Sequence, residues 1–140
     1  MNDLSKDMIK MLFCGDFITR DPQSIKLSDD FRKLLQECDI RCLNFEAPLP
    51  VGIPITIKGT AVLPQSINSP TWCENTGFNV ISLANNHMGD YGEDALKATK
   101  ESFKTAITVG AGSWDEAYRI KVIEINNTKI GFLSLAQCEF

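Results

Sequence analysis

Three short apolar segments of this 140-residue chain (9–14, 40–45 and 79–84) each run into polar residues that could bind a cation or transfer a proton. Those polar residues are, in chain order, Asp16, Asn44, Glu46, Asn85, Asn86 and His87. The carboxyl ends of parallel strands meet at one edge of an open α/β sheet, and ligands bind at that edge. If the three segments are parallel strands, we expect these side chains to lie together.

The residue types in this set indicate the chemistry. Carboxylate oxygen, amide oxygen and imidazole nitrogen suit Mn²⁺, Fe²⁺, Zn²⁺ or Mg²⁺ better than a soft metal. Two such ions roughly 3.5–4 Å apart can hold a phosphate and activate a water molecule, and a carboxylate between them can bridge both. The residues therefore favour a hydrolase of phosphoesters or of a related bond.

Each residue alone also has a structural interpretation. Gly15-Asp16 after a strand is often only a turn, Glu46 could be a solvated loop residue, and a single histidine is more often structural than catalytic. The Asn85-Asn86-His87 run is more specific, because three polar residues at the end of an apolar strand need partners if they are buried. The joint arrangement at three strand ends favours a functional site.

The elements that must position these residues follow from local signals. Helices are predicted at 28–38, with Ser28 as the cap, and at 93–106. A third helix is predicted to start with Ser69 as its cap and Pro70 at its first position, and to stop at Gly77. Residues 126–128 suit a tight hairpin turn between strands 119–125 and 129–135. Prolines make a long helix unlikely in the connection 47–66, whose length indicates function.

The alternation of strands and helices predicts a single α/β domain over residues 1–140, built with right-handed crossovers. The hydrophobic fraction of 44% and charged fraction of 23% exclude a disordered tail, a fibre or a coiled coil. A net charge of −4 without a basic cluster argues against nucleic-acid binding. We expect no membrane span, no signal peptide and a cytoplasmic location. Five cysteines at irregular spacing do not form a disulfide framework.

Several segments, in family order, resemble the CapA-like poly-γ-glutamate capsule biosynthesis proteins, a branch of the calcineurin-like metallophosphoesterases. They are CGDF (14–17), CLNFEAPL (42–49), Lys58, GFNVISLANNHMGDYG (77–92), VGAGSWDEA (109–117) and NTKIGFLSLA (127–136). The resemblance implies an α/β, metallophosphoesterase-like sandwich of two sheets flanked by helices. It also implies divalent metal cofactors, of which Mn, Fe or Zn are expected, and an anionic small-molecule or polymer substrate.

The resemblance assigns roles to residues one by one. Asp16 resembles the metal ligand of the first strand, Glu46 the bridging carboxylate with Asn44 beside it, and Asn86 the amide ligand of the second metal. His87 matches the histidine that contacts the phosphate or protonates the leaving group. Asp90 is placed to orient His87. Asn85 and Lys58 are expected to contact the substrate, although an exposed loop lysine is an equally good account of Lys58.

Two departures from the family pattern stand out. Ile18 occupies the position where related phosphoesterases carry a histidine, and the chain lacks the further histidines of the family's C-terminal half. We therefore expect an N-terminal half that is inactive alone, whose terminal Glu-Phe could be a cloning remnant. Two alternatives to a hydrolase stay open. One is a non-catalytic component that binds an acidic polymer or a partner enzyme, and the other is an interaction module that dimerises through an uncovered sheet edge.

Overall fold

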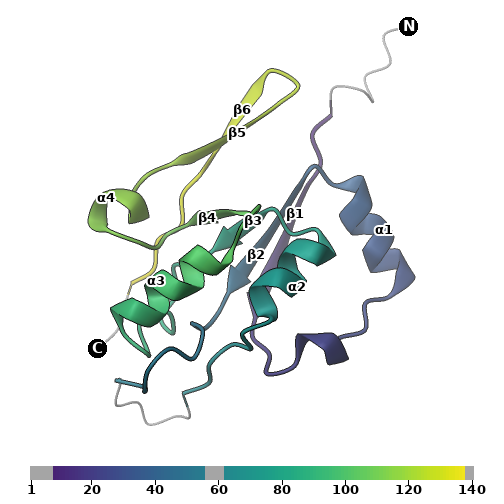
Figure 1. The fold of residues 1–140 in the computed structure, drawn as a ribbon. Helices are drawn as coiled ribbons and strands as arrows, with labels where there is room; N and C mark the ends of the chain where they lie inside the picture. Colours follow the sequence, from purple (N-terminus) through teal and green to yellow (C-terminus); the bar gives the residue numbers. More distant parts are fainter. Residues whose placement is uncertain (1–7, 56–61, 138–140) are drawn as a thin grey trace, which may run out of the picture.

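Four parallel strands form the central sheet of the computed structural model, which describes residues 8–55 and 62–137 (Figure 1). They lie in the order β1-β2-β3-β4 and span Met11–Phe17, Ile40–Phe45, Val80–Ser82 and Ile107–Val109. Since every strand runs in the same direction, the carboxyl ends of β1, β2 and β3 meet at one edge. The predicted parallel arrangement is therefore confirmed.

Three helices connect the strands and cover one face of the sheet. They are α1 (Asp29–Glu37), α2 (Ser69–Thr76) and α3 (Glu93–Ser102), and a short 3-10 turn, η2 (Pro22–Ser24), precedes α1. Right-handed crossovers that always step to the next strand leave their helices on the same face. The core beneath them includes Leu35 of α1, Phe45 of β2 and Cys73 of α2, all buried. Among the described helices, none is long and apolar enough to cross a membrane.

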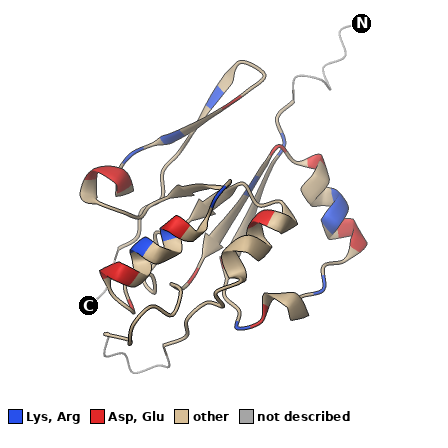
Figure 2. Ribbon diagram, in the orientation of Figure 1, with Lys and Arg blue, Asp and Glu red and all other residues tan. Residues whose placement is uncertain are grey.

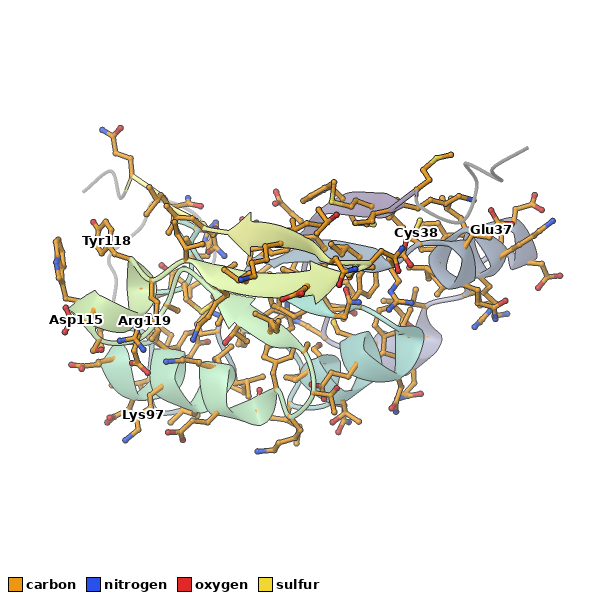
Figure 3. All side chains as sticks on the ribbon, turned by 90° about the horizontal axis from the view of Figure 1, so that it is seen from above. Glu37, Cys38, Lys97, Asp115, Tyr118 and Arg119 are labelled. Carbon is orange, nitrogen blue, oxygen red and sulfur yellow. The ribbon has the colours of Figure 1, made fainter. Side chains whose placement is uncertain are left out.

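A hairpin covers part of the opposite face and supplies the second layer. Its strands are β5 (Lys121–Ile125) and β6 (Thr128–Phe132), preceded by the short helix α4 (Trp114–Ala117). Seen from above, the hairpin lies on one side of the parallel sheet and helices α2 and α3 lie on the other (Figure 3). Phe132 packs there against Ile40, Val80 and Val109. This is the α/β sandwich of two sheets that the family resemblance implies.

The predicted helix cap at Ser28, helix stop at Gly77 and hairpin turn after residue 125 are confirmed. The side chain of Ser28 accepts a hydrogen bond from the Phe31 amide and caps α1. Gly77 ends α2 with a φ of 107°, a left-handed conformation that glycine adopts without steric cost. The turn residues Asn126 and Asn127 have φ values of 50° and 61°, as a two-residue hairpin turn requires.

Two helix boundaries differ from the prediction. Asn68 is the residue that precedes α2, so Ser69 lies inside the helix and its buried hydroxyl donates instead to Gln65 Oε1 at 3.2 Å. Helix α3 ends at Ser102 rather than at residue 106. The carboxylate of Glu74 accepts hydrogen bonds from the backbone amides of residues 104–106 at 2.6–2.9 Å, which fixes that segment in a non-helical conformation.

The surface carries interspersed charges and exposed apolar side chains, including two on β1. Lys and Arg alternate with Asp and Glu along α1 and α3, so neither sign forms a continuous block on these helices (Figure 2). Strand β1 is at an edge of the sheet, and its side chains Met11 and Phe13 are 49% and 62% exposed. Both lie on the face opposite the helices, where the hairpin packs mainly against β2, β3 and β4.

Candidate functional site

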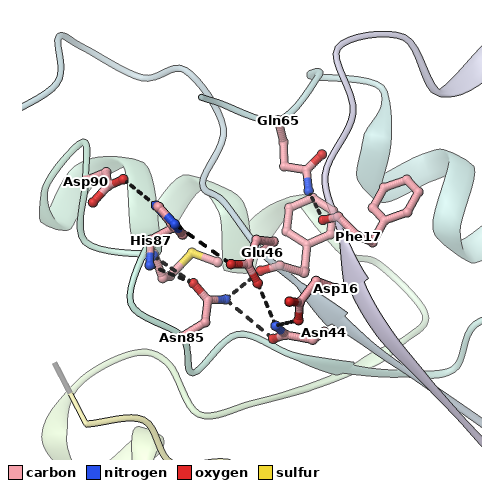
Figure 4. A network of polar contacts seen from close by, with 10 residues as sticks. Asp16, Phe17, Asn44, Glu46, Gln65, Asn85, His87 and Asp90 are labelled. Carbon is pink, nitrogen blue, oxygen red and sulfur yellow. Dashed lines mark hydrogen bonds and ion pairs between the residues drawn. The ribbon is translucent and has the colours of Figure 1, made fainter. Parts of the chain in front are cut away.

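The predicted site residues of three different segments meet at the carboxyl edge of the sheet (Figure 4). Asp16 comes from β1, Asn44 and Glu46 come from the end of β2, and Asn85 and His87 come from the loop after β3. A single network of polar contacts links all five residues. The structure thus brings together what the sequence separates by as many as 71 positions (16 to 87).

Asp16 lies inside β1, because this strand runs to Phe17, whereas the sequence predicts an apolar strand that stops at Cys14 just before Asp16. Phe13 pairs with Cys42 and Asp16 with Asn44, so β1 advances three residues where β2 advances two. The extra residue is a bulge, which places Phe13 and Asp16 on the same face of the sheet. With a regular alternation of side chains, Asp16 would instead share the helix-covered face with Leu12 and Cys14. The bulge therefore directs Asp16 toward Asn44.

Asn44 lies between the two carboxylates. Its Nδ2 donates to Asp16 Oδ1 at 2.6 Å and to Glu46 Oε2 at 2.8 Å. Ionised carboxylates only accept hydrogen bonds, and the Asn44 side chain donates only from its nitrogen. The Asn44 amide is therefore oriented with Nδ2 toward the two carboxylates. In this arrangement, Asn44 offsets part of the repulsion between two like charges.

The environment of Glu46 makes its carboxyl group harder to ionise than a solvated one. Burial raises the pKa of Glu46 above its ordinary value of 4.5, and the neighbouring charge of Asp16 raises it further. His87 and the hydrogen bond from Asn44 oppose this shift without cancelling it. A divalent cation beside the two carboxylates would relieve the same repulsion.

His87 is held by Asp90, as the resemblance implies. Its Nδ1 lies 2.9 Å from Asp90 Oδ2, and the side chain of Asp90 is almost wholly buried. An ionised carboxylate only accepts hydrogen bonds, so Nδ1 is the donor in this pair. The other ring nitrogen, Nε2, lies 3.9 Å from Glu46 Oε1. The pair therefore presents Nε2 to the carboxylate cluster.

The side chain of Asn85 organises the loop. Its Oδ1 accepts from the backbone amides of His87 and Met88, both at 3.0 Å, and its Nδ2 donates to the carbonyl of Phe45 at 2.8 Å. The substrate contact predicted for Asn85 stays a prediction, since the amide is engaged in holding His87 against β2. Asn86 is exposed in the same loop, and Lys58 lies outside the described residues.

Two supporting residues, which the sequence analysis did not identify, hold the loops that flank the site. Buried Gln65 donates from Nε2 to the Phe17 carbonyl and accepts at Oε1 from the Thr19 amide at 3.0 Å. Buried Thr99 of α3 accepts from the Leu49 amide at 2.8 Å. A polar residue in a proline-containing connection has no sequence signal that distinguishes it from a solvated one, whereas the spacing of Thr99 from Leu96 and Phe103 places it on the inner face of its helix.

The donor set fits a hard divalent cation in part. Asp16 and Glu46 provide two carboxylates, and amide oxygens are the further donors that such ions accept. Within residues 8–55 and 62–137, however, no group of three or more His, Cys, Asp or Glu side chains is arranged to hold a metal ion. Cys14, Cys38, Cys42 and Cys73 are free thiols and belong to or border the core. The described residues therefore supply part of a coordination sphere.

A sheet sandwich with a carboxylate, amide and histidine cluster at its strand ends places this chain in the class of metallophosphoesterase-like α/β folds. The sequence model for "Bacterial capsule synthesis protein PGA_cap" matches residues 10–139. The chain belongs to this capsule synthesis family, which confirms the resemblance found in the motifs. It is also 38% identical over 63 residues to the capsule biosynthesis protein CapA of Bacillus anthracis. That match covers 43% of this chain and 15% of the relative.

Proposed function

We propose that this chain carries part of the hydrolytic site of a capsule synthesis protein, which uses divalent cations to cleave a phosphoester or a related bond. The observation that supports the proposal most is the pair of carboxylates, Asp16 and Glu46, joined through Asn44 beside an oriented histidine. Two carboxylates held this close repel each other, and a bound cation would relieve that repulsion. The proposed cation is Mn²⁺, Fe²⁺ or Zn²⁺.

In this proposal Asp16 and Glu46 hold the cation, and the exposed amide of Asn86 supplies a further oxygen. A bound divalent cation would supply Lewis-acid polarisation of a phosphoryl group and would offset the negative charge of the substrate. The remaining coordination positions need donors from outside the described residues. The chain alone is therefore expected to bind cations weakly and to lack activity.

His87 is the proposed proton donor. The buried carboxylate of Asp90 fixes the hydrogen on Nδ1 and the direction of the ring. Nε2 then faces the edge where an anionic substrate would bind, and it can hold a proton for a departing oxygen or donate to a phosphoryl oxygen. The substrate itself is an anionic small molecule or polymer.

Cation titration of the purified chain tests this proposal. Calorimetry with Mn²⁺ on the wild type, Asp16→Asn and Glu46→Gln should show weak binding that both substitutions reduce. Asp115→Asn is the matched control, because Asp115 is exposed on α4 and outside the network. Binding that survives both site substitutions, or no binding by the wild type, would refute the proposed site. Hydrolysis of p-nitrophenyl phosphate by a full-length family member then tests the reaction.

A second candidate function is a non-catalytic one, in which the chain binds a partner or a second copy of itself. The exposed Met11 and Phe13 on edge strand β1 favour it, because unpaired strand edges with apolar side chains recruit other chains. We propose a homodimer through β1. Sedimentation should show self-association that Phe13→Lys abolishes, and a monomeric wild type at high concentration would exclude it.

A further inference from the structure

A chain of hydrogen bonds connects the candidate site to the hairpin layer. Ser134, which follows β6, lies with its Oγ 2.7 Å from Ser82 Oγ of β3. Ser82 Oγ lies 3.4 Å from Asn44 Oδ1. Asn44 in turn donates to both Asp16 and Glu46. The hydroxyl of Ser134 thus reaches the two carboxylates through two intermediate side chains.

The direction of this chain is fixed from the carboxylate end. Because Asn44 turns its Nδ2 toward Asp16 and Glu46, its Oδ1 faces Ser82 and must accept there. Each serine hydroxyl has one hydrogen, so Ser82 donates to Asn44 and accepts from Ser134. The donor order without a cation is therefore Ser134, Ser82, Asn44 and then the carboxylates.

A cation between the carboxylates would require the opposite order. The NH₂ group of Asn44 carries partial positive charge, and a cation is coordinated by oxygen and not by an amide nitrogen that bears hydrogens. Rotation of the carboxamide would present Oδ1 to the cation and Nδ2 to Ser82. Ser82 would then accept from Asn44 and donate to Ser134, which a pair of hydroxyls allows without any movement of the backbone. The weak contact from Asn85 Nδ2 at 3.5 Å would be lost, but Asn85 keeps its bond to Phe45.

We propose that Ser82 and Ser134 form a reversible hydrogen-bond relay that lets Asn44 present its NH₂ group to bare carboxylates and its oxygen to a bound cation. Ser134 is then a positioning residue for cation binding, although it lies in the other layer of the sandwich. This inference rests on the proposed cation site. It assigns to the hairpin a role in the chemistry, in addition to its packing against β2, β3 and β4.

The loss of the Ser82–Ser134 contact should have different effects if the contact is only a structural link between the two layers and if it is a relay. If the Ser82–Ser134 contact only ties the hairpin to the sheet, its loss lowers stability by the same amount with and without a cation. If it is a relay, its loss costs more in the cation-bound state than in the cation-free state, in which Ser82 still donates to Asn44. In that state a substituted Ser134 leaves the Ser82 hydroxyl without an acceptor when Asn44 donates to it.

Titration of Ser134 variants separates these cases. Ser134→Ala should lower the urea midpoint without Mn²⁺ by the loss of one hydrogen bond, and should in addition weaken Mn²⁺ binding about tenfold, because only the cation-bound state leaves the Ser82 donor unpaired. Ser134→Thr keeps the hydroxyl and should restore binding. Ser134 borders a cavity of about 240 Å³, so the added methyl group has space. The matched control is Ser102→Ala, a partly buried serine that bonds the Thr99 carbonyl at 2.6 Å away from the site.

The Asn44 amide gives a direct spectroscopic readout. In ¹⁵N-labelled protein, Mg²⁺ should shift the side-chain NH₂ signals of Asn44, which are assigned by their loss in Asn44→Ala. Unchanged Asn44 signals in a cation-saturated sample, or a Ser134→Ala affinity equal to that of Ser102→Ala, would overturn the relay and leave the cation site standing. No cation binding by the wild type would overturn the relay and the proposed function together.

Discussion

Substitution of Gln65 by leucine tests how the loops around the site are held. Gln65 is only 2% exposed and lies in the connection between β2 and α2. Its amide bonds three groups: the carbonyl of Phe17, the amide of Thr19 and the hydroxyl of Ser69. Leucine has a similar size and no polar atoms, so Gln65→Leu removes all three bonds while filling the space.

The magnitude follows from these three contacts. A protein hydrogen bond contributes about 1 kcal/mol net, and buried groups left without a partner cost more. The added apolar burial of leucine offsets part of that loss, at about 25 cal/mol per Å². We therefore expect the free energy of unfolding to fall by about 2–3 kcal/mol. For a chain of this size the corresponding decrease in Tm is roughly 7–10 °C.

Urea denaturation followed by circular dichroism measures this change, and Gln36→Leu on the exposed face of α1 is the matched control. The control should stay within about 0.5 kcal/mol of the wild type. Because Phe17 directly follows Asp16, Gln65→Leu should also weaken Mn²⁺ binding. A loss of stability below about 1 kcal/mol would show that solvent replaces these bonds, and would refute the view that Gln65 holds the end of β1.

Three further predictions concern charged groups. Burial and Asp16 raise the pKa of Glu46, so ionising this carboxyl group costs more in the folded chain than in the unfolded one. Glu46→Gln should therefore be more stable than the wild type at pH 7 without cations. Urea titrations should show that this advantage vanishes below pH 4.5, the ordinary pKa of the glutamate. Asp90→Asn should reduce phosphoester turnover by a full-length protein by roughly 10²-fold, with Mn²⁺ affinity retained, because the Nδ1 hydrogen of His87 is no longer fixed. Although desolvation opposes it, hydrogen bonds from three backbone amides lower the pKa of Glu74. Its stabilisation, on the order of 1 kcal/mol at this partly exposed position, should be present above pH 4.5 and lost as the pH falls through the folded pKa, a loss that Glu74→Gln should not show.

The elements that depend on neighbouring residues could be predicted from the sequence. The cap at Ser28, the stop at Gly77 and the Asn126-Asn127 turn each act within a few positions, so the local pattern contains the whole cause. The assembly of the site was also predictable in outline. Parallel strands place their carboxyl ends at one edge, whatever the details of packing.

The parts that depend on distant partners could not be predicted. The early end of α3 is set by Glu74, about 30 positions away, whose carboxylate bonds residues 104–106. Ser69 has the sequence of a helix cap, but its hydroxyl bonds Gln65 instead, which places the helix boundary one residue earlier. In both cases a long-range hydrogen bond determines a boundary that local propensity alone leaves open.

Because of the bulge in β1, the direction of the Asp16 side chain depends on the number of residues between Phe13 and Asp16, and not only on which residues they are. Gly15 has an ordinary negative φ, and a Cβ placed there would meet no atom within 4 Å, so alanine fits the position without strain. Deletion of Gly15 would likewise keep Asp16 in place, because it removes the bulge and leaves Phe13 and Asp16 two positions apart on the same face. Insertion of one residue between Phe13 and Asp16, by contrast, would keep every candidate site residue in the chain and yet rotate Asp16 toward the helix layer, away from Asn44. In comparisons among capsule synthesis proteins, a one-residue insertion at this point would therefore signal a lost site more reliably than a substitution of Gly15 would.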